Sequence, residues 1–451
     1  MELDIVGLVG ACSYALDCIE AELVHVTNRH GKRVAYISVC MAERLGIEGS
    51  ALQDLAICAM LHDNALTQYI SEEIQENNIS NISLGGSTQG DKNTVVEGGG
   101  MFNESEDIIS ENGMAYSPEI IKSIAGSIHK KIGLHCTYGE QNIKKLPFYT
   151  DVSGAVLYHH ENADGTGTFG KRWDEIPLFA RIIHLCDMVD VMGNSCDFSG
   201  ESWIRAKEYV CRNRNILFDS ECADAFLEVF SEENFVSMSQ DRFEDELWKK
   251  IPRDKRDCDF ETCKGIADFF AGIVDYKSEF TGKHSLGVAK KAAELAEYMG
   301  YSQADIEKFY MAGALHDIGK MAIGNEILEK PGRLTDEEFS RMKNHAGYTY
   351  MILSEVKDFD EVRDWAALHH EKLDGTGYPF GKKAEELNEP ERLMACVDIY
   401  QALTEARPYK SGMSHDKACS ILEDMVQKGW IDAAVTDKLR SCFEVGGRDM
   451  V

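Results

Sequence analysis

Trp365-Ala-Ala-Leu-His-His-Glu-Lys-Leu-Asp-Gly-Thr-Gly-Tyr-Pro379 is the stretch that decides how the chain is interpreted. An apolar helical run ends there at two adjacent imidazoles, His369 and His370, and the turn that follows contains glycine and proline, which no helix continues through. The carboxylates of Glu371 and Asp374 come directly after the imidazoles. Nitrogen and oxygen donors gathered at a helix end suit a divalent transition metal. The stretch therefore predicts a metal site where a helix ends.

A close copy of this stretch, His159-His-Glu-Asn-Ala-Asp-Gly-Thr-Gly167, occurs earlier in the chain, and other histidines and aspartates repeat with it. The first half of the chain carries, in order, His30, His62, Asp63, His135, His159, His160 and Asp187. The second half carries His284, His316, Asp317, His345, His369, His370 and Asp398. Ten of the 14 histidines belong to this series, which therefore predicts two related domains.

The spacings support the repeat independently of residue identity. The first histidine and the His-Asp pair are 32 residues apart in both halves, and the third histidine and the His-His pair are 24 residues apart in both. The main difference is a segment over about residues 71–116 of the first half, which is rich in Gly, Ser and Asn. Its low apolar content predicts a flexible insertion.

Length and periodicity bound the fold class. A chain of 451 residues exceeds one ordinary core, and the repeat indicates two domains. Helical periodicity dominates throughout, so we expect an all-α protein. The charged connector from Lys249 to Asp259 separates the predicted domains, which span residues 1–250 and 256–451.

Composition bounds the cellular setting. The 14 cysteines form no CxxC pair and are expected to be reduced, which favours the cytoplasm. Glu2 and Asp4 stand where a signal peptide needs positive charge, and no apolar run approaches membrane-spanning length. The net charge of −30 disfavours a nucleic acid polymer as partner. We therefore expect no membrane and no polynucleotide partner, and a homodimer is allowed.

Five histidines and two aspartates in each half exceed what one ion needs, so the series predicts a site for two divalent metal ions. The absence of cysteine from the motifs favours Fe or Mn, with Zn, Ni or Mg as alternatives. A metal pair generates hydroxide near neutral pH and clamps a phosphoryl oxygen, which is the chemistry of phosphodiester hydrolysis. An O2-activating di-metal enzyme is the rival, but it would show Glu-x-x-His helix pairs, and these ligands are not so arranged.

The second half resembles the HD-GYP family of cyclic dinucleotide phosphodiesterases, a branch of the HD-domain metallohydrolases. Beyond the histidines, the resemblance rests on Gly319-Lys320 after the His-Asp pair, on Gly377-Tyr-Pro379 and on Arg407-Pro-Tyr409. It covers roughly residues 260–445 and implies two tandem HD-type helical domains, the second of them catalytic.

The resemblance also implies roles for individual residues. The di-iron or di-manganese centre would be held by His284, His316, Asp317, His345, His369, His370 and Asp398. Asp317 and Lys320 would be catalytic, and Lys320, Tyr378 and Arg407 would bind the substrate. Lys320 lies about one turn from Asp317 and could neutralise a nonbridging phosphate oxygen. Arg407 offers a planar fork for a phosphate or a guanine edge.

The first half matches this family less completely. It keeps a second candidate metal site made of His30, His62, Asp63, His135, His159, His160 and Asp187. It lacks the substrate-binding groups: Asn64-Ala-Leu66 follows the His-Asp pair, Gly167-Thr-Phe169 replaces the Gly-Tyr-Pro turn, and the counterpart of Arg407 falls near Ser195-Cys196. We therefore expect this half to bind metal and to be a poor or inactive hydrolase.

The function implied by the resemblance is hydrolysis of a cyclic dinucleotide, with cyclic di-GMP favoured, to a linear dinucleotide or GMP. One alternative keeps the hydrolysis but changes the substrate to cyclic GMP-AMP or another nucleotide phosphoester. The other is a receptor for cyclic dinucleotides whose catalysis is vestigial. The presence of Lys320 and Tyr378 argues against a pure receptor, which has no use for a complete hydrolytic set.

Overall fold

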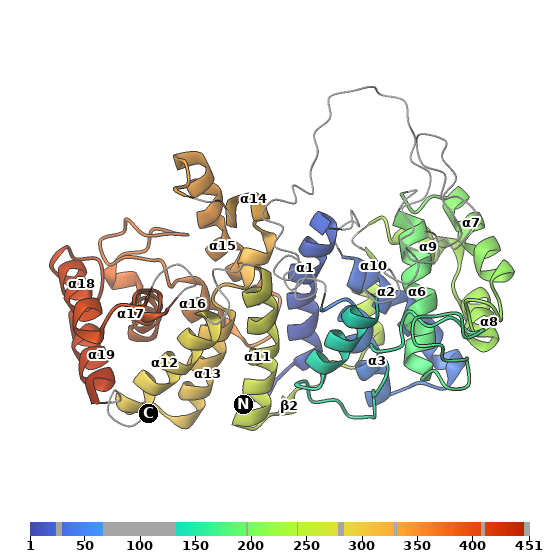
Figure 1. Ribbon diagram of the computed structural model, residues 1–451, viewed down its shortest axis with the longest axis horizontal. Helices are drawn as coiled ribbons and strands as arrows, with labels where there is room; N and C mark the ends of the chain where they lie inside the picture. The colour runs from blue at the N-terminus through green and yellow to red at the C-terminus, as the bar shows by residue number, and fades with distance from the viewer. Residues whose placement is uncertain are drawn as a thin grey trace. The chain divides into compact units, whose positions relative to one another are not determined.

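A computed structural model of the chain confirms the all-α fold (Figure 1). The structure describes residues 1–23, 29–65, 132–194, 197–240, 242–277, 284–328, 330, 332–406 and 411–445. In this part of the chain the sheet consists of two short strands, β1 (Glu2–Leu3) and β2 (Arg256–Asp257), which pair antiparallel. The predicted insertion at about 71–116 lies outside the described residues.

The chain divides into two compact units. The C-terminal unit contains Met1–Ile19, Lys145–Pro147 and Asp254–Val451, and the N-terminal unit contains Glu20–Lys144 and Phe148–Arg253. We expected domains of residues 1–250 and 256–451. The observed units differ from that expectation mainly at the start of the chain, since the first 19 residues pack with the C-terminal unit. The pairing of β1 with β2 and a hydrogen bond from the Met1 amino group to the Cys258 carbonyl (2.7 Å) hold this segment.

The N-terminal unit is built from helices. They are α2 (His30–Ala42), the 3-10 helix η1 (Glu43–Leu45), α3 (Ser50–Met60), a helix over 132–143, α6 (Leu178–Asn194), α7 (Gly200–Arg212), α8 (Ser220–Val229), α9 (Glu232–Ser237) and α10 (Arg242–Lys250). Helix α2 packs against α3, α6 and α10, and its residues are almost all buried. Its central position places His30, its first residue, inside the unit.

The C-terminal unit is also built from helices. They are α1 (Ile5–Leu23, of which residues 5–19 belong to this unit), α11 (Phe260–Lys277), α12 (His284–Tyr298), α13 (Gln303–Leu315), η2 (Ile318–Ala322), α14 (Asn325–Leu328), α15 (Asp336–Ser354), α16 (Asp360–Ala367), η3 (Ala384–Glu386), α17 (Glu389–Thr404), α18 (His415–Gln427) and α19 (Ala433–Val445). Helices α12, α13 and α17 pack against one another, and α15 packs against η2 and α16 (Figure 1). These contacts surround the segments that carry the predicted ligands.

Side-chain caps define where the ligand-bearing helices begin. Ser302 accepts a hydrogen bond from the backbone N–H of Asp305 at the start of α13. Thr335 and Glu338 form a reciprocal capping box at the start of α15, and Asn388 and Glu391 form one at the start of α17. Such caps satisfy backbone N–H groups that have no partner in the first turn. They fix the register of the helices that carry His316, His345 and Asp398.

Glycines allow the helices near both clusters to cross closely. A Cβ atom on Gly313 of α13 would lie 2.6 Å from the Ala289 Cα atom of α12. A Cβ atom on Gly31 of α2 would lie 2.7 Å from the Met60 carbonyl oxygen at the end of α3. Real Cβ atoms do not approach other atoms so closely, so the small residue is required at both crossings. These crossings bring the first histidine of each unit near the His-Asp pair.

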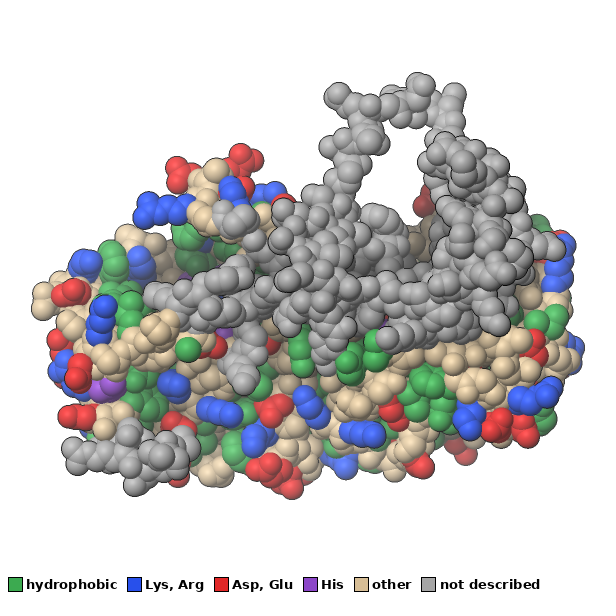
Figure 2. Space-filling model, viewed as in Figure 1, with side chains coloured by type: hydrophobic (Ala, Val, Ile, Leu, Met, Phe, Trp, Pro, Cys, Tyr) green, Lys and Arg blue, Asp and Glu red, His purple; other side chains and the backbone are tan. Residues whose placement is uncertain are grey.

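Within the described part of the chain, no helix combines the length and the apolar character needed to cross a bilayer. On the face shown in Figure 2, acidic and basic side chains are interspersed among apolar and neutral ones over the described residues.

Candidate metal centre

In the C-terminal unit, the sequence delivers ligands to the centre from helix ends. Helix α13 ends at His316, and Asp317 follows before η2 begins. Helix α16 ends at Ala367, so His369 and His370 lie just beyond it. Adjacent residues inside one helix point in different directions. A helix end relaxes that restriction, which allows both residues of each pair to turn towards one centre.

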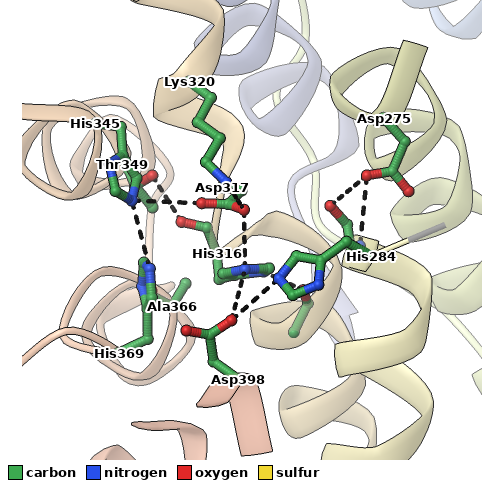
Figure 3. A network of polar contacts seen from close by, with 12 residues as sticks. Asp275, His284, His316, Asp317, Lys320, His345, Thr349, Ala366, His369 and Asp398 are labelled. Atoms are coloured by element: carbon green, nitrogen blue, oxygen red, sulfur yellow. Dashed lines mark hydrogen bonds and ion pairs between the residues drawn. The ribbon is translucent and has the colours of Figure 1, made fainter. Parts of the chain in front are cut away.

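One group of donors surrounds Asp398, which lies on α17. The Asp398 Oδ1 atom is 3.1 Å from His284 Nε2 and 3.7 Å from His316 Nε2 (Figure 3). Each of these residues offers a ligand atom within 4.8 Å of the others, and all three are buried. The arrangement gives one carboxylate and two imidazoles facing a common point.

A second group lies across Asp317. It contains His345, His369 and His370, whose ligand atoms lie within 4.8 Å of one another. The His345 Nε2 atom is 3.5 Å from His369 Nε2. The Asp317 Oδ1 atom is 3.4 Å from His345 Nε2, while Asp317 Oδ2 is 3.1 Å from His316 Nε2 (Figure 3). Each oxygen of this carboxylate therefore faces a different histidine group, as a residue that bridges two metal ions would.

The charge states fit metal binding in most of the cluster. Burial alone would raise the pKa values of Asp317 and Asp398, but the neighbouring histidines, and Lys320 beside Asp317, hold both carboxyl pKa values far below their usual range. Burial lowers the pKa of His345 and His369, and it lowers that of His370 to about 3. Ionised carboxylates and neutral imidazoles are the forms that coordinate a cation.

His284 behaves differently. Burial lowers its pKa, but hydrogen bonds to Asp398 and Glu405 outweigh burial and raise the pKa to about 10. Two carboxylates at one imidazole leave negative charge that a proton or a metal ion would offset. A divalent cation between Asp398 and His284 would take the place of that proton.

Unpartnered buried atoms test whether the residues fit a metal pair. The His316 Nε2 and Asp317 Oδ1 atoms are buried and form no hydrogen bond with the described residues. Buried polar atoms without a partner are costly, and coordination of an ion would satisfy them. The donor set of the C-terminal unit, made of imidazole nitrogens and carboxylate oxygens, therefore fits divalent ions.

Two of the three predicted substrate groups lie beside this cluster. The Lys320 ammonium donates a hydrogen bond to Asp317 Oδ2 over 2.5 Å. The Tyr378 ring lies over His370, with 4.7 Å between the ring centroids, and near His345 at 6.3 Å. Arg407 lies outside the described residues. Lys320 and Tyr378 thus flank the two histidine groups from different elements.

The carboxylates of Glu371 and Asp374, which follow His370 in the sequence, serve the turn and not the cluster. Glu371 accepts hydrogen bonds from the backbone N–H groups of Phe380, Gly381 and Lys382. Asp374 accepts from the backbone N–H and the hydroxyl of Thr376. Glu371 and Asp374, which follow the paired histidines in the sequence, therefore hold the turn that carries Tyr378.

The N-terminal unit brings its predicted ligands together in a similar way. His30, His62 and Asp63 form one donor group, and His135, His159 and His160 form another. The Asp63 Oδ1 atom is 2.9 Å from His135 Nε2, and Asp63 Oδ2 is 3.6 Å from His62 Nε2. Asp63 therefore faces both groups, as Asp317 does. Asp187 stands farther out, with Oδ1 3.4 Å from His30 Nε2.

The structure adds groups to the N-terminal site that sequence reasoning missed. Asp190 accepts a hydrogen bond from His30 Nδ1 (2.7 Å) and two from the Arg33 guanidinium (2.6 and 2.9 Å). Asp190 is three residues beyond Asp187 on α6, a helical spacing that could have drawn attention to it. Cys136 is buried with Sγ 4.0 Å from His159 Nδ1, although the sequence had assigned no thiol to either site.

Comparisons with known proteins identify the family of the chain. An HD domain family model matches residues 126–212 and 268–435, which is more than half of the chain. The 3'3'-cGAMP-specific phosphodiesterase 1 of Vibrio cholerae is 30% identical over 340 residues, covering 73% of this chain and 78% of that protein. A cyclic di-GMP phosphodiesterase of the same organism is 40% identical over 167 residues, 34% of each chain.

A solved structure extends the likeness to the whole fold. The crystal structure of a cyclic GMP-AMP specific phosphodiesterase from V. cholerae has a TM-score of 0.63 and covers 99% of this chain and 98% of its own. Its sequence identity is 23%, so it supports the fold alone. The helical fold and the paired histidine–aspartate groups define an HD-domain metallohydrolase. Within that class, the chain belongs to the HD-GYP family, whose members depend on metal for phosphodiester hydrolysis.

Proposed function

We propose that the C-terminal unit hydrolyses a phosphodiester bond of a cyclic dinucleotide at the cluster centred on Asp317. The proposal rests on the position of Asp317. Its two carboxylate oxygens face separate histidine groups. Membership of the HD-GYP family supplies the reaction class. The product would be a linear dinucleotide or GMP.

The proposed metal ligands fall into two sets that share Asp317. His284, His316 and Asp398 would hold one ion, and His345, His369 and His370 would hold the other. Such ions, when bound, supply Lewis acidity to a phosphoryl oxygen and lower the pKa of a bound water. The nitrogen and oxygen donors favour Fe or Mn, with Zn, Ni or Mg as alternatives.

The remaining residues act on the substrate. Lys320 is paired with Asp317 and is close enough to the centre to neutralise a nonbridging phosphate oxygen. Tyr378, whose ring covers His370, offers a face and a hydroxyl for a nucleotide. Arg407 is expected to contact phosphate or a base. Positioning by these groups supplies part of the rate enhancement.

Two substrates have support. Cyclic di-GMP is the substrate predicted from the motif of the second half, and the 40% identity to a cyclic di-GMP phosphodiesterase falls in a segment of 167 residues. The 3'3'-cyclic GMP-AMP molecule is the second candidate. The relative specific for it aligns over 340 residues, a length that must extend beyond the C-terminal unit into the first half. The similarity to a relative with this specificity therefore includes part of the N-terminal unit.

The N-terminal unit is proposed to bind metal at His30, His62, Asp63, His135, His159, His160 and Asp187 without efficient hydrolysis. Its cluster has Asp63, which would contact both ions, but lacks counterparts of Lys320 and Tyr378, whose positions hold Leu66 and Thr168. A receptor role for this unit follows from a site that binds without turnover. The homodimer, the cytoplasmic location and the absence of membrane and polynucleotide partners stay predictions from the sequence.

The test is an assay of the full chain, purified without oxygen and loaded with Mn2+ or Fe2+, against cyclic di-GMP and 3'3'-cyclic GMP-AMP in parallel. We expect a linear dinucleotide or mononucleotide from one or both. A loaded protein that leaves both substrates intact would refute the proposed activity. A higher kcat/KM for one substrate identifies the preferred cyclic dinucleotide.

A further inference from the structure

Five of the ten clustered histidines share one kind of hydrogen bond. Their Nδ1 atoms donate to the backbone carbonyl three residues earlier. The acceptors are Gly313 for His316 (2.7 Å), Met342 for His345 (2.7 Å), Ala366 for His369 (2.6 Å), Ala59 for His62 (2.9 Å) and Val156 for His159 (2.5 Å). A carbonyl can only accept, so Nδ1 carries the proton and Nε2 carries the lone pair. This bond aims the Nε2 lone pair at the metal cluster.

The first histidine of each unit cannot use this device. His284 is the first residue of α12 and His30 is the first residue of α2, so no earlier residue of the same helix can offer a carbonyl. In both units a carboxylate contacts Nδ1 instead. The Glu405 Oε2 atom is 3.1 Å from His284 Nδ1, and Asp190 Oδ2 is 2.7 Å from His30 Nδ1. The Asp190 side chain is fully buried, and that of Glu405 is 12% exposed.

Glu405 and Asp398 contact opposite nitrogens of one ring. Asp398 lies on α17 and faces His284 Nε2 at 3.1 Å, whereas Glu405 lies just after the last residue of α17 and faces Nδ1. Glu405 therefore stands on the far side of the imidazole from the donor group of His284, His316 and Asp398. This placement gives Glu405 an orienting contact and not a ligand position.

The two units reach this result from different sequence positions. Asp190 lies three residues after Asp187, and the matching residue in the C-terminal unit is Gln401, three residues after Asp398. Gln401 packs so close to Gly287 that a Cβ atom there would lie 2.1 Å from Gln401 Nε2. The acceptor in the C-terminal unit comes instead from Glu405, one helical turn further. Both units therefore place a carboxylate at Nδ1 of the first histidine, although the two carboxylates do not occupy matching positions of the repeat.

We infer that Glu405 is a positioning residue, which holds His284 with its Nδ1 proton donated and its Nε2 lone pair directed at the proposed metal centre. A carboxylate acceptor fixes the tautomer and the ring orientation of a ligating histidine and increases its basicity. This inference rests on the proposed metal centre. It adds a residue that neither the repeat spacing nor the family motif indicated.

The experiment measures Mn2+ binding to the full chain by calorimetric titration. Every protein carries Asp63→Ala, so that the titration reports on the C-terminal unit. Glu405→Ala removes the acceptor, Glu405→Gln keeps a neutral acceptor, and Glu385→Ala is the control, because Glu385 is an exposed glutamate of the same unit. We expect Glu405→Ala to weaken Mn2+ binding about 10- to 100-fold, as loss of an outer acceptor does, with Glu405→Gln intermediate and Glu385→Ala unchanged.

A second measurement separates orientation from damage to the fold. Thermal unfolding of the metal-free proteins should be alike, and raising Mn2+ should restore turnover by Glu405→Ala, because the defect lies in metal affinity. Unchanged Mn2+ affinity in both Glu405 variants overturns the inference while leaving the metal centre standing. If Glu405→Ala fails to fold, the test rests on Glu405→Gln. A wild-type Mn2+ affinity in that variant then overturns the inference. A parent chain that takes up no Mn2+ overturns both the centre and the role of Glu405.

Discussion

Lys320 and Asp317 form an ion pair at the centre of the proposed active site, with 2.5 Å between Lys320 Nζ and Asp317 Oδ2 (Figure 3). The pair joins a carboxylate that faces both histidine groups to a cation on the next turn. The Lys320 side chain is 22% exposed and that of Asp317 is 2% exposed, so only the lysine is accessible to a substrate. This asymmetry is consistent with the proposed roles, in which Asp317 binds metal and Lys320 contacts the phosphate.

Replacing Lys320 by Ala should lower kcat by about 10² or more, as loss of a preorganised electrostatic group does. Metal content should be unchanged, because Asp317 loses only a competing cation. The measurement is kcat together with metal per chain by elemental analysis. Loss of metal from the variant would show that Lys320 supports the ligands and does not act on the substrate.

Tyr378→Thr places in the C-terminal unit the residue that the first half has at Thr168. The change removes the ring that covers His370 at 4.7 Å. We expect kcat/KM to fall about tenfold through the loss of a stacking surface worth about 1–3 kcal/mol per base. Tyr378→Phe keeps the ring and serves as the matched control. Equal activity of the Thr variant and the wild type would remove Tyr378 from the substrate site.

Gly377→Ala tests the turn that carries Tyr378. A Cβ atom at Gly377 would lie 2.3 Å from the Lys372 backbone nitrogen and 2.5 Å from the Glu371 Cα atom. Overpacking of this kind costs about 1–3 kcal/mol, which in a unit of this size lowers Tm by about 3–10 °C. Gly272→Ala in α11 is the control, because nothing lies within 4 Å of its added Cβ atom. A Gly377 variant as stable and active as the Gly272 variant would contradict the packing described here.

Metal removal should destabilise the protein. Ions that bind only the folded state stabilise it by about 4 kcal/mol at a thousandfold excess over Kd, which corresponds to roughly 10 °C in Tm. Chelation followed by addition of Mn2+ should lower Tm and then restore it, as scanning calorimetry would record. If Tm stays constant through both steps, the buried histidines serve packing and bind no ion.

The sequence predicted which histidines meet because helical repeats preserve spacing, and equal intervals between His30 and His62 and between His284 and His316 imply equal placement. It could not predict the partners that have no counterpart in the repeat. Glu405 supports His284 from beyond the end of α17, and no motif marks it. The apolar residues 5–19 of α1 likewise carry no motif, so the spacing did not show that they pack with the C-terminal unit.

The acids next to the paired histidines show a different limit. Composition alone does not distinguish a ligand from a residue that holds a turn, since Glu371 and Asp374 have the chemistry of either. Only the direction of the side chain decides, and Glu371 turns towards backbone N–H groups. The role of Arg407 stays a prediction, because it lies outside the described residues.

The most direct test of the account is hydrolysis by two matched double variants of the full chain. His316→Ala with Asp317→Ala removes the proposed centre of the C-terminal unit, and His62→Ala with Asp63→Ala makes the same change in the N-terminal unit. Both are kept in the full chain, because a fragment of residues 1–250 would separate α1 from the unit it packs with. With cyclic di-GMP and 3'3'-cyclic GMP-AMP as substrates, the first variant should lose all turnover while the second retains most of it. Turnover near the wild-type rate in the first variant, or its loss only in the second, would contradict the assignment of catalysis to the C-terminal unit.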